Sequence, residues 1–191
     1  MLGCCRVVDK TRQQPNNFTT FTFMATSDMS KLLRSIPQIG KVDWIGIRPK
    51  RRATLEEVTV AEITIEDGLV HDHYTSKKGK RKVTLIQAEH LQAVAGMLQQ
   101  QAPISPFLTR RNIVVSGLNL IALKNRQFTI GDEVILEGTG YCQPCSRMEE
   151  NLGPGGYNAM RGHGGITARV IRGGVIKKGA TIKFKDISGK E

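Results

Sequence analysis

Two cysteines in the segment 142–145, Cys-Gln-Pro-Cys, are the side chains of this sequence best suited to covalent or metal chemistry. The next four residues, Ser-Arg-Met-Glu at 146–149, fit the S-x-x-E pattern of a capping box, which predicts that a short helix begins there. Cys145 would then lie just before a helix N-terminus with Arg147 beside it, and both features favour a thiolate. We therefore predict that Cys145 is catalytic and can ligate a metal.

The spacing of the two cysteines also fits other kinds of site. A C-x-x-C pair is half of a zinc site, but Cys4 and Cys5 are adjacent and His163 offers a single further ligand. A thioredoxin-like redox pair would need a βαβ context that the sequence does not show. Two buried structural cysteines are the remaining interpretation.

A glycine-rich segment at 153–165 follows directly and holds six glycines among 13 residues. Glycines let a backbone approach a ligand closely and expose N–H groups to an anion. Asn158, Arg161 and His163 would add side-chain donors there. The alternative is a long turn in which His163 is a structural histidine.

Two further segments combine charged and titratable side chains. Arg110, Arg111 and Asn112 open an expected strand, and paired guanidinium groups suit a phosphate or a carboxylate. The segment 71–74, His-Asp-His-Tyr, follows an expected turn, and Asp72 and His73 could orient or protonate a substrate. A solvated turn is the alternative for this second segment.

The formal net charge of +11 favours acidic partners, and the basic runs at 48–52 and 77–82 are the densest clusters. Aromatic residues are only 5% of the chain, which is too few for a base-stacking platform, and no zinc-finger, RNP or helix-turn-helix pattern is present. We expect solvated basic loops or a small anionic ligand held by residues such as Arg81, and no nucleic acid.

The elements expected to position these residues are mainly short strands. β-branched enrichment and flanking turn residues predict strands at 41–47, 58–65, 82–86, 112–116, 133–137, 166–171 and 181–185. One helix is expected where Leu91, Val94, Ala95 and Leu98 form an apolar face, ending before Pro103. This pattern predicts a mainly β fold, a closed or nearly closed β-barrel with a few short helices. A β-sandwich is the alternative.

The ends of the chain differ from the middle in composition. We expect a flexible N-terminal tail at 1–30, or a true start at Met24 or Met29, then one domain at 31–185 and a C-terminal tail at 186–191. No apolar run reaches the 18 or more residues of a membrane-spanning helix, so no membrane association is expected. The cysteine usage is not that of a disulfide framework, which favours a cytoplasmic setting.

Several ordered segments together resemble the MOSC domain, the module found at the C-terminus of molybdenum-cofactor sulfurases and in stand-alone bacterial proteins. The resemblance runs from about Lys31 to Phe184, and the segments that carry it are 83–87, 111–117, 128–132, 142–149, 162–165 and 175–179. Two positions depart from the family pattern. His71 replaces a glycine that often precedes the Asp-His pair, and Ala180 replaces an acidic residue after the last turn.

The resemblance implies a barrel-like fold and a family cysteine that matches Cys145. In relatives that carry the molybdenum cofactor, a molybdopterin with a dithiolene and a phosphate, this cysteine binds the metal. Some relatives reduce N-hydroxylated bases and amidoximes with electrons from a partner reductase. We therefore expect Asp72 and His73 on the substrate side and a cofactor-binding set of Arg81, Arg110, Arg111, Asn112, Arg147, Asn158, Arg161 and His163.

Two alternatives come from other classes of protein. In the first, Cys145 carries a persulfide without catalysis, delivered by a cysteine desulfurase that uses pyridoxal phosphate. In the second, the two basic runs bind nucleic acid.

Overall fold

A closed sheet of seven strands forms the body of the protein in this computed structural model, which describes residues 29–74 and 79–185. The strands are β1 (Ile39–Ile47), β5 (Val83–Gln87), β6 (Ile113–Ser116), β7 (Gln127–Ile130), β8 (Val134–Tyr141), β9 (Ile166–Arg172) and β11 (Thr181–Phe184). Their order is β11-β7-β8-β9-β5-β6-β1, and pairing between β1 and β11 closes the sheet into a barrel. The predicted barrel is confirmed, and the sandwich alternative is wrong.

Only β5 and β6 pair in parallel within the barrel; the other neighbouring strands are antiparallel. A parallel pair needs a long connection, and here the connection contains α2 (Ala88–Met97) and α3 (Pro106–Thr109). The helix expected from the apolar periodicity is confirmed as α2, whose buried residues are Leu91, Val94 and Ala95.

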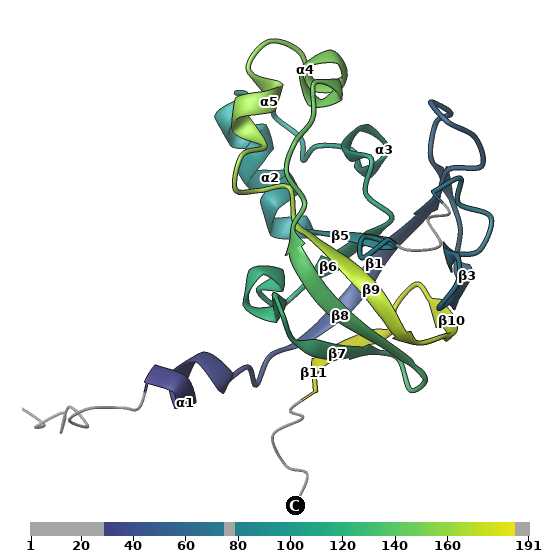
Figure 1. The fold of residues 1–191 in the computed structure, drawn as a ribbon. Coiled ribbons are helices and arrows are strands. Elements are labelled where there is room, and N and C mark those ends of the chain that lie inside the picture. Colours follow the sequence, from purple (N-terminus) through teal and green to yellow (C-terminus); the bar gives the residue numbers. More distant parts are fainter. Residues whose placement is uncertain (1–28, 75–78, 186–191) are drawn as a thin grey trace, which may run out of the picture.

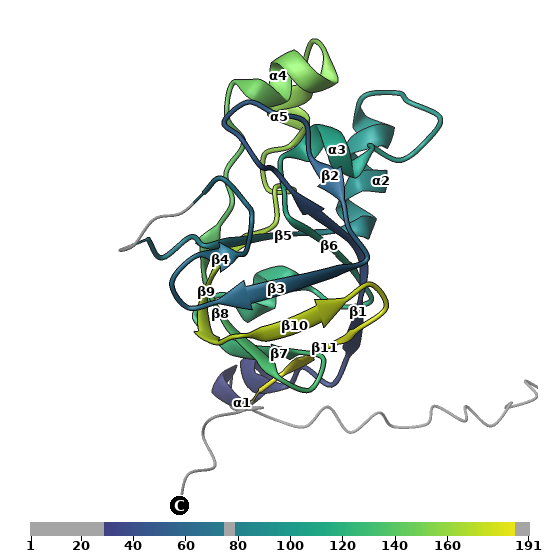
Figure 2. The same ribbon diagram turned by 90° about the vertical axis from the view of Figure 1, so that its right-hand side faces the viewer.

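A second, small sheet covers one side of the barrel (Figure 2). It consists of β10 (Gly174–Lys177), β3 (Val60–Thr64) and β4 (Gly68–Leu69). The two-residue β2 (Glu56–Glu57) pairs antiparallel with the end of β1. Ile63, Leu69 and Ile176 of this sheet belong to the same buried cluster as Phe128 and Ile182 of the barrel. The small sheet therefore shares the core of the barrel.

The remaining helices divide between the two ends of the barrel. Helices α2, α3, α4 (Arg147–Leu152) and α5 (Gly156–Ala159) gather at one end, whereas α1 (Met29–Arg34) lies at the other (Figures 1 and 2). A second buried cluster joins this helical end to the barrel, and it includes Trp44, Ile86, Val94 and Met148. A 3₁₀ helix, η1 (Leu120–Leu123), packs against Gly138 of β8, where an added Cβ would overlap the Leu123 carbonyl oxygen.

The short helix predicted after Cys145 is present as α4, but the predicted capping box is not. Ser146 has helical dihedral angles and makes no side-chain cap hydrogen bond. The carboxylate of Glu149 instead accepts hydrogen bonds from the backbone N–H groups of Gly155 and Tyr157, both at 2.8 Å. Glu149 therefore joins α4 to the start of α5 rather than closing its own helix.

No helix in 29–74 or 79–185 has the length and apolarity needed to span a bilayer. The predicted tails at 1–30 and 186–191 fall almost wholly outside the described residues; Met29 and Ser30 begin α1.

Candidate functional site

A cavity of about 450 Å³ opens where loops from the barrel meet near the start of α4. Its residues come from the end of β8 and the loop after it, the α3–β6 connection, the loop after β4, the residue after β1, and the starts of β5 and β9. They are Arg48, Asp72, His73, Tyr74, Arg81, Lys82, Thr84, Arg110, Arg111, Asn112, Tyr141, Cys142, Gln143, Pro144, Cys145 and Thr167. We call it the Cys145 cavity.

The Cys145 thiol is exposed in this cavity and has one charged neighbour within hydrogen-bonding distance. Arg110 Nη1 donates to Cys145 Sγ at 3.4 Å. Arg110 directly follows α3 and has a left-handed backbone, with φ 60° and ψ 30°, which is uncommon for a residue with a Cβ. This turn at the end of α3 brings the guanidinium of Arg110 to the cysteine.

Arg111 has a different role from its neighbour, because its side chain is buried, with 4% exposed. Its Nε donates to Gly164 O at 2.8 Å, Nη1 to Thr109 O at 2.9 Å, and Nη2 to Cys142 O at 3.0 Å. Burial lowers the pKa of the Arg111 guanidinium, and the nearby Cys142 and Cys145 thiols oppose that shift. Arg111 therefore holds the cysteine loop in place and directs its donors at backbone carbonyls.

The two cysteines lie in unlike environments. Cys142 is partly buried and Cys145 is exposed. Burial raises the pKa of the Cys142 thiol, and the positive charges of Arg111 and Arg81 act in the opposite direction. The two side chains line one cavity, but only Cys145 presents an exposed thiol.

Asp72 and Asn112 tie the loop after β4 to the barrel. Buried Asp72 accepts from Arg48 N at 2.8 Å, from Tyr74 N at 3.2 Å and from Asn112 Nδ2 at 3.3 Å. Asn112 Oδ1 in turn accepts from Thr84 Oγ1 at 2.7 Å. These contacts hold the loop after β4 against the starts of β5 and β6. The Asp72 carboxylate therefore lies at the wall of the cavity.

His73 lies beside Asp72, with Nδ1 at 3.8 Å from Oδ2. That Nδ1 is buried and has no hydrogen-bond partner among the described residues. His71, which stands where the resemblance led us to expect glycine, has φ 68°, the left-handed conformation that glycine adopts at little cost. The loop therefore keeps a glycine-like turn, and Asp72 and His73 line the cavity.

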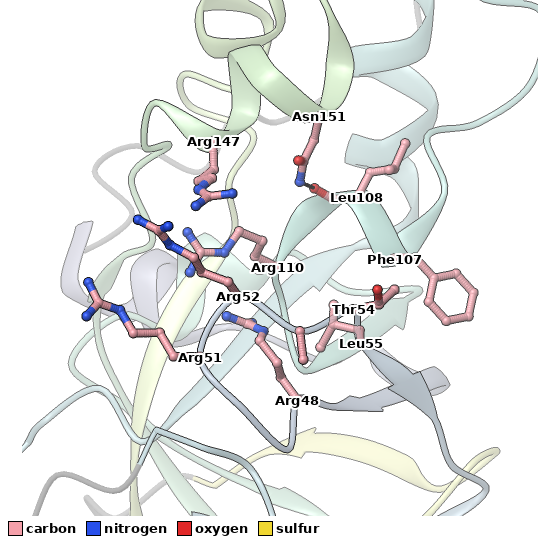
Figure 3. Close-up of a pocket in the computed structure, with 11 residues that line it drawn as sticks. Arg48, Arg51, Arg52, Thr54, Leu55, Phe107, Leu108, Arg110, Arg147 and Asn151 are labelled. Carbon is pink, nitrogen blue, oxygen red and sulfur yellow. Dashed lines mark hydrogen bonds between the residues drawn. The ribbon is translucent and has the colours of Figure 1, made fainter.

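Four residues of the expected cofactor-binding set lie elsewhere. Asn158 borders a surface hollow next to Leu98, and Arg161 is exposed outside the cavity. The ring of His163 packs edge-to-face on that of His90, with ring centroids 4.9 Å apart. Arg147 pairs with Glu150 at 3.2 Å and lines a neighbouring cavity (Figure 3). Gly162, Gly164 and Gly165 line a different cavity together with Cys142, and a binding loop in this glycine-rich segment stays a prediction.

Three of the six glycines of that segment, Gly156, Gly164 and Gly165, are closely packed. Gly165 has φ 78°, and an added Cβ would overlap Leu85 O of β5. A Cβ at Gly164 would overlap Cys142 O. Each side chain larger than hydrogen would thus push the cysteine loop or β5 out of place.

Sequence reasoning missed several residues that line the Cys145 cavity. Arg48 and Lys82 were taken for parts of solvated basic runs, although Arg48 is only 7% exposed. Burial was not foreseeable from a run of five basic or turn residues. Thr84, Tyr141 and Thr167 carry no charge and gave no signal. Among the described residues no group of three or more His, Cys, Asp or Glu side chains could hold a metal, so a zinc site has no complete ligand set there.

Comparison with known proteins agrees with this architecture. A family model described as the MOSC domain matches residues 61–183. No curated protein matches the chain in sequence.

Solved structures share the fold at low sequence identity. The YuaD protein from Bacillus subtilis has a TM-score of 0.68 at 17% identity, over 77% of this chain and 96% of that one. YiiM from Geobacillus stearothermophilus has a TM-score of 0.62 at 17% identity, over 77% of this chain and 75% of that one. YiiM from Escherichia coli has a TM-score of 0.58 at 18% identity, over 76% and 70% of the two chains. Because the family model covers most of the barrel and both the β4 and cysteine loops, the chain belongs to the MOSC domain family.

Proposed function

We propose that this protein binds the molybdenum cofactor in the Cys145 cavity, with the Cys145 thiolate as the protein ligand to the metal. The observation that carries the proposal is an exposed thiol beside Arg110 in a strongly basic cavity. Five basic residues line that cavity, Arg48, Arg81, Lys82, Arg110 and Arg111, against one carboxylate, Asp72. A soft sulfur donor suits a metal that already carries dithiolene sulfur, and the basic lining suits an anionic cofactor.

The basic residues that line the cavity fall into two groups, those whose side-chain donors are free and those whose donors bind backbone carbonyls. Arg110 and Arg81 can contact anionic groups of the cofactor. Arg111 is engaged with backbone carbonyls and keeps the cysteine loop in position, and Lys82 Nζ donates to the carbonyls of Ile65 and Glu66. Asn112 acts on the site through Asp72 and Thr84. The bound cofactor would supply two-electron redox chemistry, and the protein would supply its orientation and the proton transfers.

The reaction class proposed is reduction of N-hydroxylated compounds. Two electrons from a partner reductase and two protons convert N–OH to N–H and release water as the N–O bond breaks. His73 is the proposed proton donor, because its ring lines the cavity, its Nδ1 lacks a partner in the described structure and Asp72 lies beside it.

The test is metal and pterin analysis of protein expressed in a host that makes the cofactor. The wild type should retain molybdenum and pterin, and Cys145→Ser should lose at least about 90% of the metal, because a hydroxyl is a poor soft-metal ligand. Cys142→Ser serves as the matched control and should retain most of it. Wild-type molybdenum content in Cys145→Ser would contradict the proposal.

A persulfide carrier is the second candidate, and the exposed Cys145 thiol beside Arg110 favours it equally. A cysteine desulfurase with pyridoxal phosphate would donate the sulfur: an S–S bond forms on Cys145 as the S–S bond of the donor persulfide breaks. Mass spectrometry of the Cys145 peptide after incubation with desulfurase and cysteine would show one added sulfur atom. Both candidates need free thiols, so a reducing, cytoplasmic setting is part of the proposal.

A further inference from the structure

A second cavity of about 400 Å³ adjoins the Cys145 cavity, and arginines dominate its lining. The five arginines are Arg48, Arg51, Arg52, Arg110 and Arg147. Arg48 and Arg110 line both cavities. Figure 3 shows the guanidinium groups of Arg48, Arg52, Arg110 and Arg147 gathered on one side of this second cavity, which we call the arginine pocket.

Most of this positive charge has no paired carboxylate among the residues that the structure describes. No acidic residue lines the arginine pocket, and of its arginines only Arg147 forms an ion pair, with Glu150 at 3.2 Å. Arg48, Arg51 and Arg52 make no side-chain hydrogen bond or ion pair with any residue that the structure describes. Clustered like charges repel one another, so the site is poised for an anion.

Arg48 is the strongest single indication of a built site. Its side chain is 7% exposed and its guanidinium points into the arginine pocket (Figure 3). Burial and the neighbouring Arg110 lower the pKa of Arg48, with partial compensation from Asp72. The Arg48 guanidinium faces a cavity and has no hydrogen-bonded partner among the described residues, and an anionic ligand would supply one.

The backbone at the pocket is also unusual. Arg52 and Arg110 both have left-handed conformations, with φ 69° and 60°. Side chains are held in such conformations at a cost, and they cluster at binding sites. Here both strained residues direct arginine side chains to the same cavity.

The other side of the arginine pocket is apolar. Leu55, Phe107 and Leu108 line it, and the Phe107 ring packs edge-to-face on Trp44 with centroids 5.3 Å apart. Asn151 Nδ2 donates to Leu108 O at 2.8 Å, which orients the carboxamide at the rim (Figure 3). Arginine binds phosphate in a bidentate manner, and an apolar wall suits an organic ring attached to that phosphate.

We propose that the arginine pocket binds the phosphate of a phosphorylated substrate whose reacting end reaches the Cys145 cavity. That the arginine pocket is part of a substrate site rests on the proposed function. That it binds phosphate does not depend on the proposed function. The Cys145 cavity has Arg81 for the anionic groups of a cofactor, and Arg81 does not line the arginine pocket. Two anionic groups can therefore be held on either side of Arg48 and Arg110.

Isothermal titration calorimetry at about 0.15 M salt tests this assignment. The probes are adenosine 5′-monophosphate and adenosine, each titrated into cofactor-free and cofactor-loaded protein. The nucleotide should bind both forms, and adenosine should bind at least about tenfold more weakly. The double variant Arg51→Gln/Arg52→Gln should bind the nucleotide at least about tenfold more weakly. Lys183→Gln/Lys185→Gln removes the same charge on or just after β11 and should bind like the wild type.

Three outcomes separate the possibilities. Equal affinity of the two double variants, or no preference for the phosphorylated probe, would overturn the assignment. Nucleotide binding that disappears on loading would place the cofactor's own phosphate in the arginine pocket and would also overturn it. Arginine-dependent binding in a protein that retains no molybdenum would refute the proposed function and leave the phosphate site standing.

Discussion

Adjacent residues Arg110 and Arg111 illustrate how far identical side chains can differ in role. The left-handed turn at Arg110 sends its guanidinium to Cys145 Sγ, while Arg111 is buried against the carbonyls of Thr109, Cys142 and Gly164. The sequence led us to expect a pair of exposed arginines that share one anion. Only Arg110 is free to do so.

The first prediction follows from this contrast. Arg111→Ala should lower the free energy of unfolding by about 3 kcal/mol, because it leaves buried carbonyl groups without donors. Arg110→Ala should change it by no more than about 0.5 kcal/mol, because that side chain makes one long contact at the cavity. Urea unfolding of both variants measures the difference. Equal stability of the two variants would contradict a structural role for Arg111.

The two thiols should also react unequally. Cys145 is exposed, whereas burial both shields Cys142 and raises its pKa, so Cys142 has less thiolate and less access. Iodoacetamide at pH about 6.5 should modify Cys145 at least about tenfold faster, as followed by mass spectrometry of the two thiols. Raising the pH should speed the Cys142 reaction, because more of its thiol then becomes thiolate. Similar rates at both positions would show that the loop opens readily.

Among the elements, α4 and α5 are joined by a single carboxylate. Glu149 accepts hydrogen bonds from Gly155 N and Tyr157 N, and these two bonds lower its pKa. The S-x-x-E pattern thus located the helix correctly and misassigned the partner of its glutamate. The two helices lie directly after the cysteine loop, so their junction supports the site.

The pH dependence of stability should report this junction. Because the folded-state pKa of Glu149 is lowered, its contribution is complete above the unfolded value of about 4.3 and is lost as the pH falls through the folded value. Glu149→Gln should therefore lower the melting temperature at pH 7 and weaken its dependence on pH below about 4.3. Glu150→Gln, which affects only the ion pair with Arg147, is the control. An unchanged acid profile in Glu149→Gln would exclude the junction as its source.

The contact between β5 and the turn before β9 gives a sharper test of packing. Gly165→Ala should destabilise the protein by at least about 2 kcal/mol, because the new Cβ meets the backbone at Leu85 and φ is positive. Gly96→Ala in α2 is the matched control: nothing lies within 4 Å of its added Cβ, and it should stabilise by about 1 kcal/mol. Chemical denaturation measures both. A neutral effect of Gly165→Ala would mean that the turn shifts freely.

The elements were more predictable from the sequence than the site. Long β-branched runs revealed β1 and β9. Of the four strands of four residues, β6 and β11 were predicted and β7 and β10 were not, so length alone did not decide which short strands were found. Closure between β1 and β11 joins residues more than 130 positions apart and leaves no local pattern. His163 is of a residue type that often binds ligands, but its ring packs on that of His90. This contact joins residues far apart in the sequence, so no local pattern indicates it.

For the whole molecule, the distribution of charge is more informative than its sum. Eight of the 28 basic residues line the two adjoining cavities, whereas Asp72 is the only acidic residue in the described lining of either cavity. Concave sites of a few hundred Å³ select small anions, because a duplex cannot enter them. The net charge of +11 would still attract polyanions without specificity.

Binding to nucleic acid should therefore be weak and should depend steeply on salt. A fluorescent duplex should bind with a Kd above about 1 μM at about 0.15 M salt. Contacts between exposed basic side chains and phosphates release counterions from the DNA, so added salt weakens them. The two double variants, Arg51→Gln/Arg52→Gln and Lys183→Gln/Lys185→Gln, remove equal charge. Both should weaken binding of the duplex to the same extent, whereas only the arginine variant should weaken binding of a phosphorylated small molecule. Fluorescence anisotropy over a salt series measures both. Tight duplex binding that only the arginine variant abolishes would mean that the arginine pocket lies within a nucleic-acid surface, since a purely electrostatic contact cannot distinguish two variants of equal charge.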